Sequence, residues 1–270
     1  MATSGDYVLG THDAEIARLE LQHGVWRARA LEAWQRAGIG PGHTVLDLGC
    51  GPGFAALDLA DAVGAAGRVI ALDRSTRFLD VLGRACAARG IGHVETRACD
   101  LDADELPAGV DAAWSRWVFS FVERPRELLA RVARALRVGG VFVAHEYCDY
   151  AAWRASPRDP ELEDFVARVM ASWRARGGEP DIGPALLGWM PALGLEPTSV
   201  RAIVEVARPG SPHWEWLLRF GEVGVQRLVE LGEVSAERGA ELAAAWAACA
   251  TRPGVQMITP AVIEIVAVRR

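Results

Sequence analysis

A glycine-rich segment stands directly after an apolar run early in the chain. Residues 45–53 read VLDLGCGPG, so Gly49, Gly51 and Gly53 follow the end of a predicted buried strand. Glycines at such a point let the backbone turn tightly and approach a bound ligand without interference from a Cβ atom. Because a helix is predicted next, its exposed amides and the positive end of its dipole face the same place. The segment therefore indicates a ligand-binding loop.

An acidic residue completes this pattern. Asp73 lies twenty residues beyond Gly53, at the end of the next predicted strand. A carboxylate at that position can accept hydrogen bonds from both hydroxyl groups of a ribose. The glycines and Asp73 together therefore indicate a cofactor that contains a nucleoside.

Two classes of cofactor are compatible with the pattern. Residues 51–56 read GPGFAA and satisfy the G-x-G-x-x-G/A fingerprint of dinucleotide-binding folds, which favours an NAD(P)-dependent oxidoreductase. Asp47 favours the other class, since a carboxylate repels a pyrophosphate but attracts a sulfonium or α-ammonium group. We therefore expect S-adenosylmethionine as the cofactor and S-adenosylhomocysteine as its product, with the nicotinamide enzyme as the alternative.

The composition excludes several other enzyme classes. All 29 basic residues among the 270 are arginine, and the sequence contains neither lysine nor asparagine. P-loop nucleotide-binding sites, protein kinases, pyridoxal enzymes and Schiff-base aldolases all need a lysine amine. Basic contacts to a cofactor or substrate must therefore come from arginine, histidine or backbone amides.

The bulk properties favour a cytoplasmic protein that acts on a small molecule. The formal net charge of -6 argues against nucleic acid or an anionic membrane as the main partner. The sequence shows no secretory signal and no membrane-spanning run of about 18 apolar residues, and its five scattered cysteines suit reduced thiols. No metal site is expected, because His145, Cys148 and Asp149 lack a recognised zinc spacing. A homodimer is left open.

Strands and helices alternate along the first half of the chain, which is typical of a parallel sheet covered on both faces. Up to residue 148 the apolar periodicity predicts strands at 44–48, 68–72, 93–98, 110–114 and 141–144, and helices at 11–37, 54–64, 75–89 and 125–137. After residue 148 it predicts helices at 160–176, 184–193 and 212–250, and strands at 198–206 and 261–268.

Four segments carry a family resemblance: the glycine segment 45–53, the strand end 71–73, the acidic stretch 99–107 and the helix–strand segment 128–143, LLARVARALRVGGVFV. In this order they resemble class I S-adenosylmethionine-dependent methyltransferases, in particular the ubiquinone/menaquinone-type small-molecule enzymes. The similarity covers most of residues 40–148 and implies an α/β fold with a Rossmann-like, seven-stranded, mostly parallel sheet, helices on both faces and helical lid insertions.

We predict one domain over residues 1–270. Residues 1–40 are expected to form an N-terminal helical cover and residues 41–148 the cofactor-binding core. The segments 150–180 and 208–256 are expected to be helical insertions that form a lid over the substrate.

The resemblance and the charge argument imply a set of cofactor contacts. The glycines would line the methionine and ribose portions, Asp73 would hold the ribose, and Asp100 would contact the adenine amine. Arg116, just after the fourth strand, would bind the cofactor carboxylate or an acidic group of the substrate. The full set of expected cofactor-binding residues is Tyr7, Gln22, Asp47, Gly49, Gly51, Gly53, Asp73, Arg74, Asp100, Leu101 and Arg116.

Candidates for catalysis follow the fifth predicted strand. Methyl transfer is an in-line displacement at a carbon activated by positive sulfur, so an enzyme mainly aligns the nucleophile and excludes water. His145, whose ordinary pKa is close to neutrality, is the first candidate for a general base, and Glu146 is expected to orient neighbouring groups. Both are expected to face the cleft at the carboxyl ends of the strands. Substrate contacts are expected from Trp117, Tyr147, His213 and Trp214.

The expected activity is methylation of a small molecule, with O-methylation slightly ahead of C-methylation. The Asn-Pro-Pro-aromatic motif of amino-group methyltransferases is absent after the fourth strand, which argues against methylation of nucleic-acid bases. A protein that binds the cofactor without transferring its methyl group is a further alternative.

Overall fold

The structure is a computed structural model that describes residues 12–270, so the predicted contact Tyr7 lies outside the described residues. Its centre is a seven-stranded sheet in the order β3-β2-β1-β4-β5-β10-β7. These strands span Thr44–Leu48 (β1), Arg68–Asp73 (β2), Val94–Ala98 (β3), Val110–Arg116 (β4), Leu136–Asp149 (β5), Leu195–Ile203 (β7) and Ala261–Arg269 (β10).

Parallel pairing runs through the first five of these strands. β1 pairs with β2 and β4, β2 pairs with β3, and β4 pairs with β5, all in parallel. β10 lies antiparallel between β5 and β7. The prediction of a seven-stranded, mostly parallel α/β sheet is confirmed.

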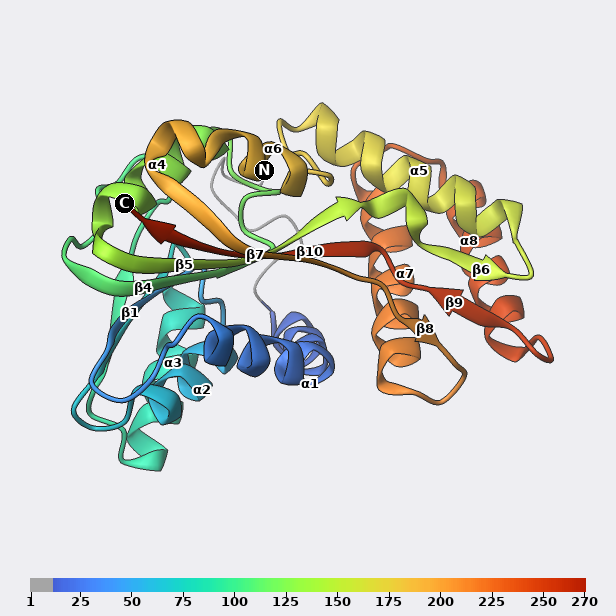
Figure 1. Cartoon of the computed structure of the whole chain (residues 1–270). Coiled ribbons are helices and arrows are strands. Elements are labelled where there is room, and N and C mark those ends of the chain that lie inside the picture. The colour runs from blue at the N-terminus through green and yellow to red at the C-terminus, as the bar shows by residue number, and fades with distance from the viewer. Residues whose placement is uncertain (1–11) are drawn as a thin grey trace.

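Helices cover both faces of this sheet (Figure 1). One face carries α1 (Asp13–Arg36), α2 (Phe54–Val63) and α3 (Thr76–Arg89), and the other carries α4 (Pro125–Ala135) and α6 (Gly183–Trp189). Val45 and Leu46 are both buried, but they belong to different core clusters, one under each layer of helices. This alternation is what a strand buried on both faces requires.

A largely helical part extends from the ends of β5 and β10 (Figure 1). Its core is aromatic, since Phe165 packs edge to face on both Trp153 and Trp246. It comprises the helices α5 (Pro160–Ala175), α7 (Pro212–Glu230) and α8 (Ala236–Thr251) and a small antiparallel sheet of β6 (Arg154–Ser156), β9 (Gln256–Ile258) and β8 (Val206–Ala207). Two short 3-10 helices span Tyr150–Ala152 and Pro191–Leu193.

Several element predictions differ from the structure. The helix predicted at 125–137 ends at Ala135, and the strand predicted at 141–144 begins at Leu136, which pairs with Val110. The helix predicted at 212–250 is two helices, because Gly232 adopts a φ of 72° and the side chain of Ser235 caps α8. The small sheet was not predicted, since strands of two or three residues show no periodicity in the sequence.

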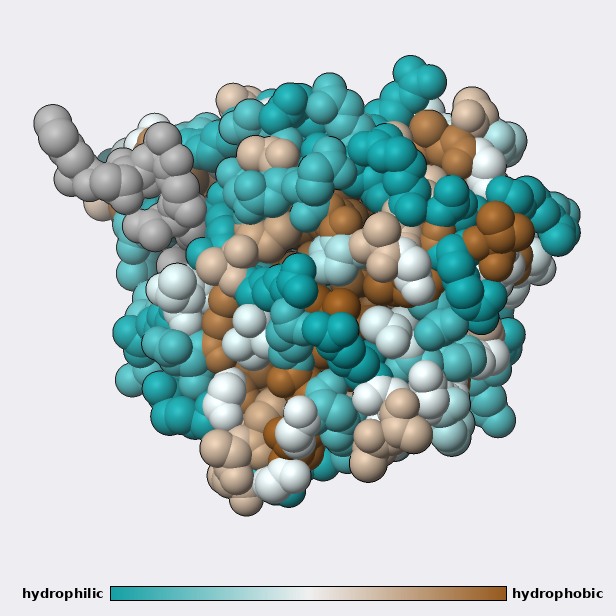
Figure 2. All heavy atoms as spheres, turned by 90° about the vertical axis from the view of Figure 1, so that its left-hand side faces the viewer, coloured by the Kyte–Doolittle hydropathy of each residue, from teal (hydrophilic) through white to brown (hydrophobic). Residues whose placement is uncertain are grey.

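The outer surface is mixed in character. Figure 2 views the side of the molecule that lies at the left of Figure 1, and apolar residues are visible in the middle of that face with hydrophilic residues around them. Apolar atoms form much of any folded protein's surface, so such exposure is ordinary. Among residues 12–270, no helix is long and apolar enough to cross a membrane.

Candidate functional site

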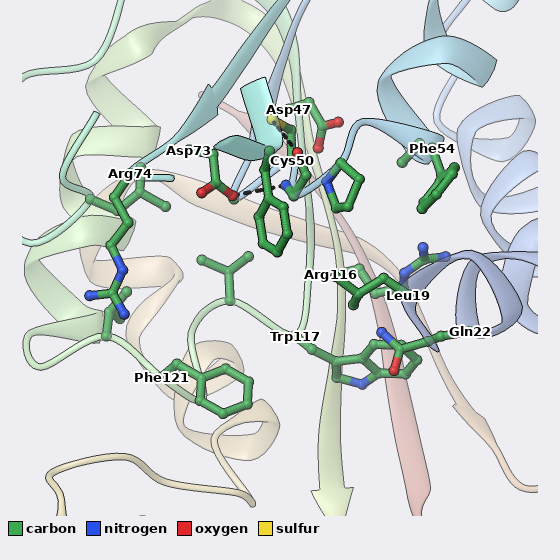
Figure 3. Close-up of a pocket in the computed structure, with 18 of the residues that line it drawn as sticks. Leu19, Gln22, Asp47, Cys50, Phe54, Asp73, Arg74, Arg116, Trp117 and Phe121 are labelled. Carbon is green, nitrogen blue, oxygen red and sulfur yellow. Dashed lines mark hydrogen bonds between the residues drawn. The ribbon is translucent and has the colours of Figure 1, made fainter. Parts of the chain in front are cut away.

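A ligand-sized cavity opens where β1, β2 and β4 end. Its volume of about 190 Å³ is many times the roughly 10–15 Å³ that one water molecule needs. Arg74 and Phe54 lie at opposite ends of this cavity, and the glycine loop lies between them (Figure 3). Of the predicted ligand contacts, the cavity wall contains Gln22, Asp47, Gly49, Gly51, Asp73, Arg74, Asp100, Leu101, Arg116, Trp117 and Tyr147.

The glycine loop connects β1 to α2 and needs glycine for different reasons along its length. Gly49, Gly51 and Gly53 all have positive φ, at 62°, 55° and 89°. A Cβ on Gly53 would lie 2.4 Å from the side chain of Leu82, whereas a Cβ on Gly51 would meet nothing within 4 Å. Gly51 lines the cavity and Gly53 does not. Gly53 therefore packs α2 against α3, and it is the one glycine of the predicted three that does not line this cavity.

Asp73 fixes the glycine loop from the neighbouring strand. Its carboxylate accepts hydrogen bonds of 2.8 Å from the backbone amides of Gly51 and Ser75, and the first of these is drawn in Figure 3. Burial raises the pKa of Asp73, and the two amide hydrogen bonds oppose that rise. The carboxylate still lines the cavity and has lone pairs left for a ligand's hydroxyl groups.

Asp47 and Arg116 both line the cavity and have unused hydrogen-bonding capacity. Asp47 is only 2% exposed, and burial raises its pKa to about 8 although Arg116 opposes the rise. Burial likewise lowers the pKa of Arg116 to about 10, against the attraction of Asp47. Within the part of the chain that the structure describes, Oδ2 of Asp47 and Nη1 of Arg116 have no hydrogen-bond partner. Such orphaned groups suit a ligand that carries both an ammonium and a carboxylate.

Arg116 is held from the N-terminal helix by a residue that the sequence analysis did not single out. Nη2 of Arg116 lies 3.0 Å from Nδ1 of His23, and Nε2 of His23 lies 3.0 Å from Oδ2 of Asp58. Arg27 also donates two hydrogen bonds to Asp58. His23 lines the cavity. In the sequence it is one position on an apolar helical stripe, which gives no sign of a partner 93 residues away.

Aromatic side chains form the other half of the cavity. Trp117 stacks on Tyr147 at 5.2 Å between ring centroids, and Phe121, Trp173 and Phe220 complete the aromatic wall. Trp117 has a φ of 53°, which is strained for a bulky residue. Its indole N–H is buried and has no hydrogen-bond partner among the described residues. Trp173 and Phe220 come from the helical part, and no sequence pattern predicted either as a site residue.

His145 does not face the cavity, so the predicted general base is wrong in its placement. Its side chain is 0% exposed and packs edge to face on Trp114, with Nε2 at 3.3 Å from Oε2 of Glu264. Burial lowers the pKa of His145, and the pull of Glu264 does not outweigh it. Alternation along β5 puts this side chain on the face covered by α1, where Arg36 holds the same Glu264. We assign His145 a structural role.

Glu146 points to the opposite face of β5 and clamps the loop after β4. Its carboxylate accepts hydrogen bonds from the amides of Val118 and Phe119, at 2.8 and 2.9 Å, and from the hydroxyl of Ser120 at 2.9 Å. Burial raises its pKa to about 7. Glu146 does not line the cavity, but Val118 does. Glu146 is therefore a positioning residue for the cavity wall and not a group that touches a ligand.

Replacement of Glu146 by alanine is expected to destabilise the protein by about 3–5 kcal/mol, because three buried donors lose their acceptor. Glu146→Gln is the matched control, since its amide oxygen can still accept from the two backbone amides; a loss of about 1 kcal/mol is expected there. Urea denaturation at neutral pH measures both. Equal stability of the two variants would contradict the clamp.

The remaining predicted residues divide into two groups. Asp100 and Leu101 lie at the cavity next to β3, and Asp100 accepts a hydrogen bond from the amide of Asp102. His213 and Trp214, which were predicted as substrate contacts, do not line this cavity. Trp214 is buried in the aromatic core of the helical part. No group of three or more His, Cys, Asp or Glu residues within 12–270 is arranged to hold a metal ion.

Comparisons with known proteins show similarity to a family over part of the chain. Residues 45–140 match a family described as a methyltransferase domain. An uncharacterized 37.1 kDa protein in transposon TN4556 of Streptomyces fradiae is 37% identical over 107 residues, which are 39% of this chain and 30% of that protein.

Two solved structures illustrate the shared fold. The [4+2]-cyclase SpnF has 18% identity and a TM-score of 0.57, over 90% of this chain and 80% of its own. Geranyl diphosphate C-methyltransferase from Streptomyces coelicolor A3(2), in complex with Mg²⁺, geranyl diphosphate and S-adenosyl-L-homocysteine, has 20% identity and a TM-score of 0.57, over 92% of this chain and 80% of its own. At these identities the likeness is one of fold.

Proposed function

We propose that the chain transfers a methyl group from S-adenosylmethionine to a small planar or hydrophobic acceptor, and the match of residues 45–140 to a methyltransferase-domain family supports this proposal. The observation that carries the proposal is one cavity with two unlike halves. Asp47, Asp73 and Arg116 supply charge in one half, and aromatic rings including Trp117 and Tyr147 form the other.

The polar half fits S-adenosylmethionine, which when bound supplies a methyl group on positively charged sulfur. Asp47 would attract the ammonium group, and Arg116 would donate hydrogen bonds to the carboxylate. Asp73 would hold the ribose hydroxyls beside the glycine loop. The backbone near Gly51 leaves open space there, because no side chain projects from it.

The aromatic half fits an acceptor with a flat or apolar body. Trp117 is 8% exposed, and its unpaired N–H can donate to one oxygen of such a molecule. Arg18 also lines this region, but it is engaged by Glu15 through two hydrogen bonds of 2.7 and 2.8 Å. Residues 150–180 and 208–256 would act as a lid, because Trp173 and Phe220 come from them.

The cavity offers little general-base capacity, and this favours O-methylation over C-methylation. Among the described residues that line the cavity, His23 is the one histidine, and both of its ring nitrogens already have partners. An acceptor with an acidic hydroxyl, such as a phenol with a pKa of about 10, needs less help from a base than a carbon acid does. Alignment and exclusion of water by the aromatic wall would then carry most of the catalysis.

Calorimetry and product mass test this proposal. Purified protein is titrated with S-adenosylhomocysteine and with NAD, and binding of the first alone is expected. The protein is then incubated with S-adenosylmethionine and a panel of phenols, catechols, quinols and enols, and one product should gain the mass of one methyl group. Binding of NAD instead would support the oxidoreductase.

In one alternative function, the protein binds S-adenosylmethionine but does not transfer its methyl group. The [4+2]-cyclase SpnF shares this fold, so a fold of this kind also serves other chemistry. A substrate that is converted without any gain in mass, while S-adenosylmethionine is not consumed, would favour this alternative over the methyltransferase.

A further inference from the structure

A chain of side chains leads from the N-terminal helix to the charged half of the cavity. Arg27 and His23 of α1 both bond to Asp58 of α2, and His23 also bonds to Arg116 at the end of β4. His23 is mostly buried, and its ring lies nearly parallel to that of Phe54 at 6.0 Å between centroids. The ring therefore has little freedom to turn.

The partners of His23 determine which of its nitrogens carries the proton. A guanidinium group can only donate hydrogen bonds, so Nδ1 must accept the bond from Arg116. Nε2 then carries the hydrogen and donates it to the carboxylate of Asp58. His23 is thus neutral, and Asp58 fixes it in the tautomer that can hold Arg116.

The second terminal nitrogen of Arg116 has no hydrogen-bond partner within residues 12–270. Nη2 is used by His23, while Nη1 is buried and has no partner within residues 12–270. The rings of Trp114 and Trp117 lie 5.9 and 5.5 Å from the guanidinium carbon and restrict its plane. Asp47 is the acidic group that attracts Arg116 most strongly.

We propose that His23 and Asp58 are a positioning pair, which holds Arg116 so that Nη1 binds the carboxylate at the amino-acid end of the cofactor. This inference rests on the proposed function, because it assigns that end of the cofactor to Arg116. It adds that the N-terminal helix, and not only the glycine loop, determines how tightly the cofactor is held.

The pair makes cofactor binding sensitive to acid. When His23 gains a proton, Nδ1 becomes a donor that faces another donor 3.0 Å away, and two cations are left side by side. Burial lowers the pKa of His23, so this change falls below its ordinary value of 6.5. The charged groups that face His23 are Asp58 on α2, Arg27 on its own helix and Arg116 on β4. Asp47 faces Arg116 and titrates separately, at a higher pH.

Two variants separate the roles of the two ring nitrogens. His23→Asn places an amide oxygen about where Nδ1 lies, so it keeps the acceptor for Arg116 and cannot titrate. His23→Gln places its amide nearer to Nε2, so it keeps the bond to Asp58 and loses the acceptor for Arg116. Calorimetry at pH 7.5 is expected to show S-adenosylhomocysteine binding to His23→Gln about tenfold more weakly than to wild type, and to His23→Asn within about threefold.

A truncated ligand is the internal control. 5′-Methylthioadenosine lacks the amino-acid end, so both variants and the wild type should bind it equally. The ratio of wild-type to His23→Asn affinity for S-adenosylhomocysteine should stay constant above pH 7 and fall below about pH 6.5. The reason is that the two proteins share every titratable group except His23, which the variant lacks.

Three results would overturn the inference. Wild-type affinity in His23→Gln would exclude a role for the Nδ1 acceptor. A parallel loss of 5′-methylthioadenosine binding would indicate general damage to the cavity. Failure of the wild type to bind S-adenosylhomocysteine at all would instead remove the proposed function, and this inference with it.

Discussion

Replacement of Asp47 by asparagine is expected to stabilise the ligand-free protein at pH 8 and, at the same time, to weaken S-adenosylhomocysteine binding about 10- to 100-fold. Asp47 is a buried acid whose pKa is about 8 in the fold, against 3.8 ordinarily. Between these values the folded state holds a proton that the unfolded state has released. The stability of the wild type therefore falls as the pH rises through this window, at up to about 1.4 kcal/mol per pH unit.

Asparagine has no charge to bury, so the variant should lack this slope. Urea denaturation at pH 5 and pH 8 measures it: the two proteins should be closer in stability at pH 5, and the variant should be clearly more stable at pH 8. A variant that is less stable than the wild type at pH 8 would contradict the burial of an unpaired carboxyl group at this position.

The predicted loss of S-adenosylhomocysteine binding can be tested separately, through the release of a proton when the ligand binds. A cationic ammonium group at Asp47 favours the ionised carboxylate, so binding at pH 7 should release close to one proton from a group whose pKa is about 8. Calorimetry in two buffers of different ionisation enthalpy detects that proton. The asparagine variant should release none, and release of the same proton by both proteins would exclude Asp47 as its source.

Replacement of Gly53 by alanine is expected to destabilise the fold by about 2–5 kcal/mol. About 1–2 kcal/mol of this arises from placing an L-residue at a φ of 89°. The remainder, about 1–3 kcal/mol, arises from overpacking, because the new Cβ would lie 2.4 Å from Leu82, which is fully buried. Thermal and urea denaturation of the ligand-free protein measure the loss.

Gly51→Ala is the matched comparison on the same loop. Its φ of 55° is also positive, but its Cβ would meet nothing within 4 Å, so only about 1–2 kcal/mol of backbone strain is expected. Because Gly51 lines the cavity, the added methyl group occupies ligand space. The two alanines should thus separate, with Gly53→Ala losing mainly stability and Gly51→Ala losing mainly affinity for S-adenosylhomocysteine. The reverse pattern would contradict the roles assigned to the two glycines.

Most helices and strands could be predicted from the sequence, because the hydrophobic periodicity that marks them depends only on residues close together in the chain. The strand at 44–48 was predicted with the bounds that β1 has, and the helix at 160–176 differs from α5 by one residue. The break between α7 and α8 was missed, although Gly232 and Ser235 are ordinary stop and start signals. The Trp- and Ala-rich composition of residues 212–250 favoured one continuous helix instead.

The residues of the polar half of the cavity could also be predicted from the sequence. Asp47, Gly51 and Asp73 lie within a few residues of strand ends, and parallel strands bring their carboxyl ends to one edge of a sheet. For such residues, position along the chain nearly determines position in space.

Other assignments depended on contacts between segments far apart in the chain. The sequence placed His145 at the right strand, but a shift of one residue along a strand turns a side chain to the other face. The helix α1 covers the face on which His145 lies, and Glu264 of the adjacent β10 bonds to it there. The histidine that does reach the cavity, His23, owes its role to Arg116 and Asp58, 93 and 35 residues away. The sequence by itself determined the fold and the loop that receives a cofactor, because both follow from local periods and strand ends. The tertiary structure decided which histidine, which carboxylate and which aromatic rings meet there, because their roles arise only when separate helices pack on the sheet.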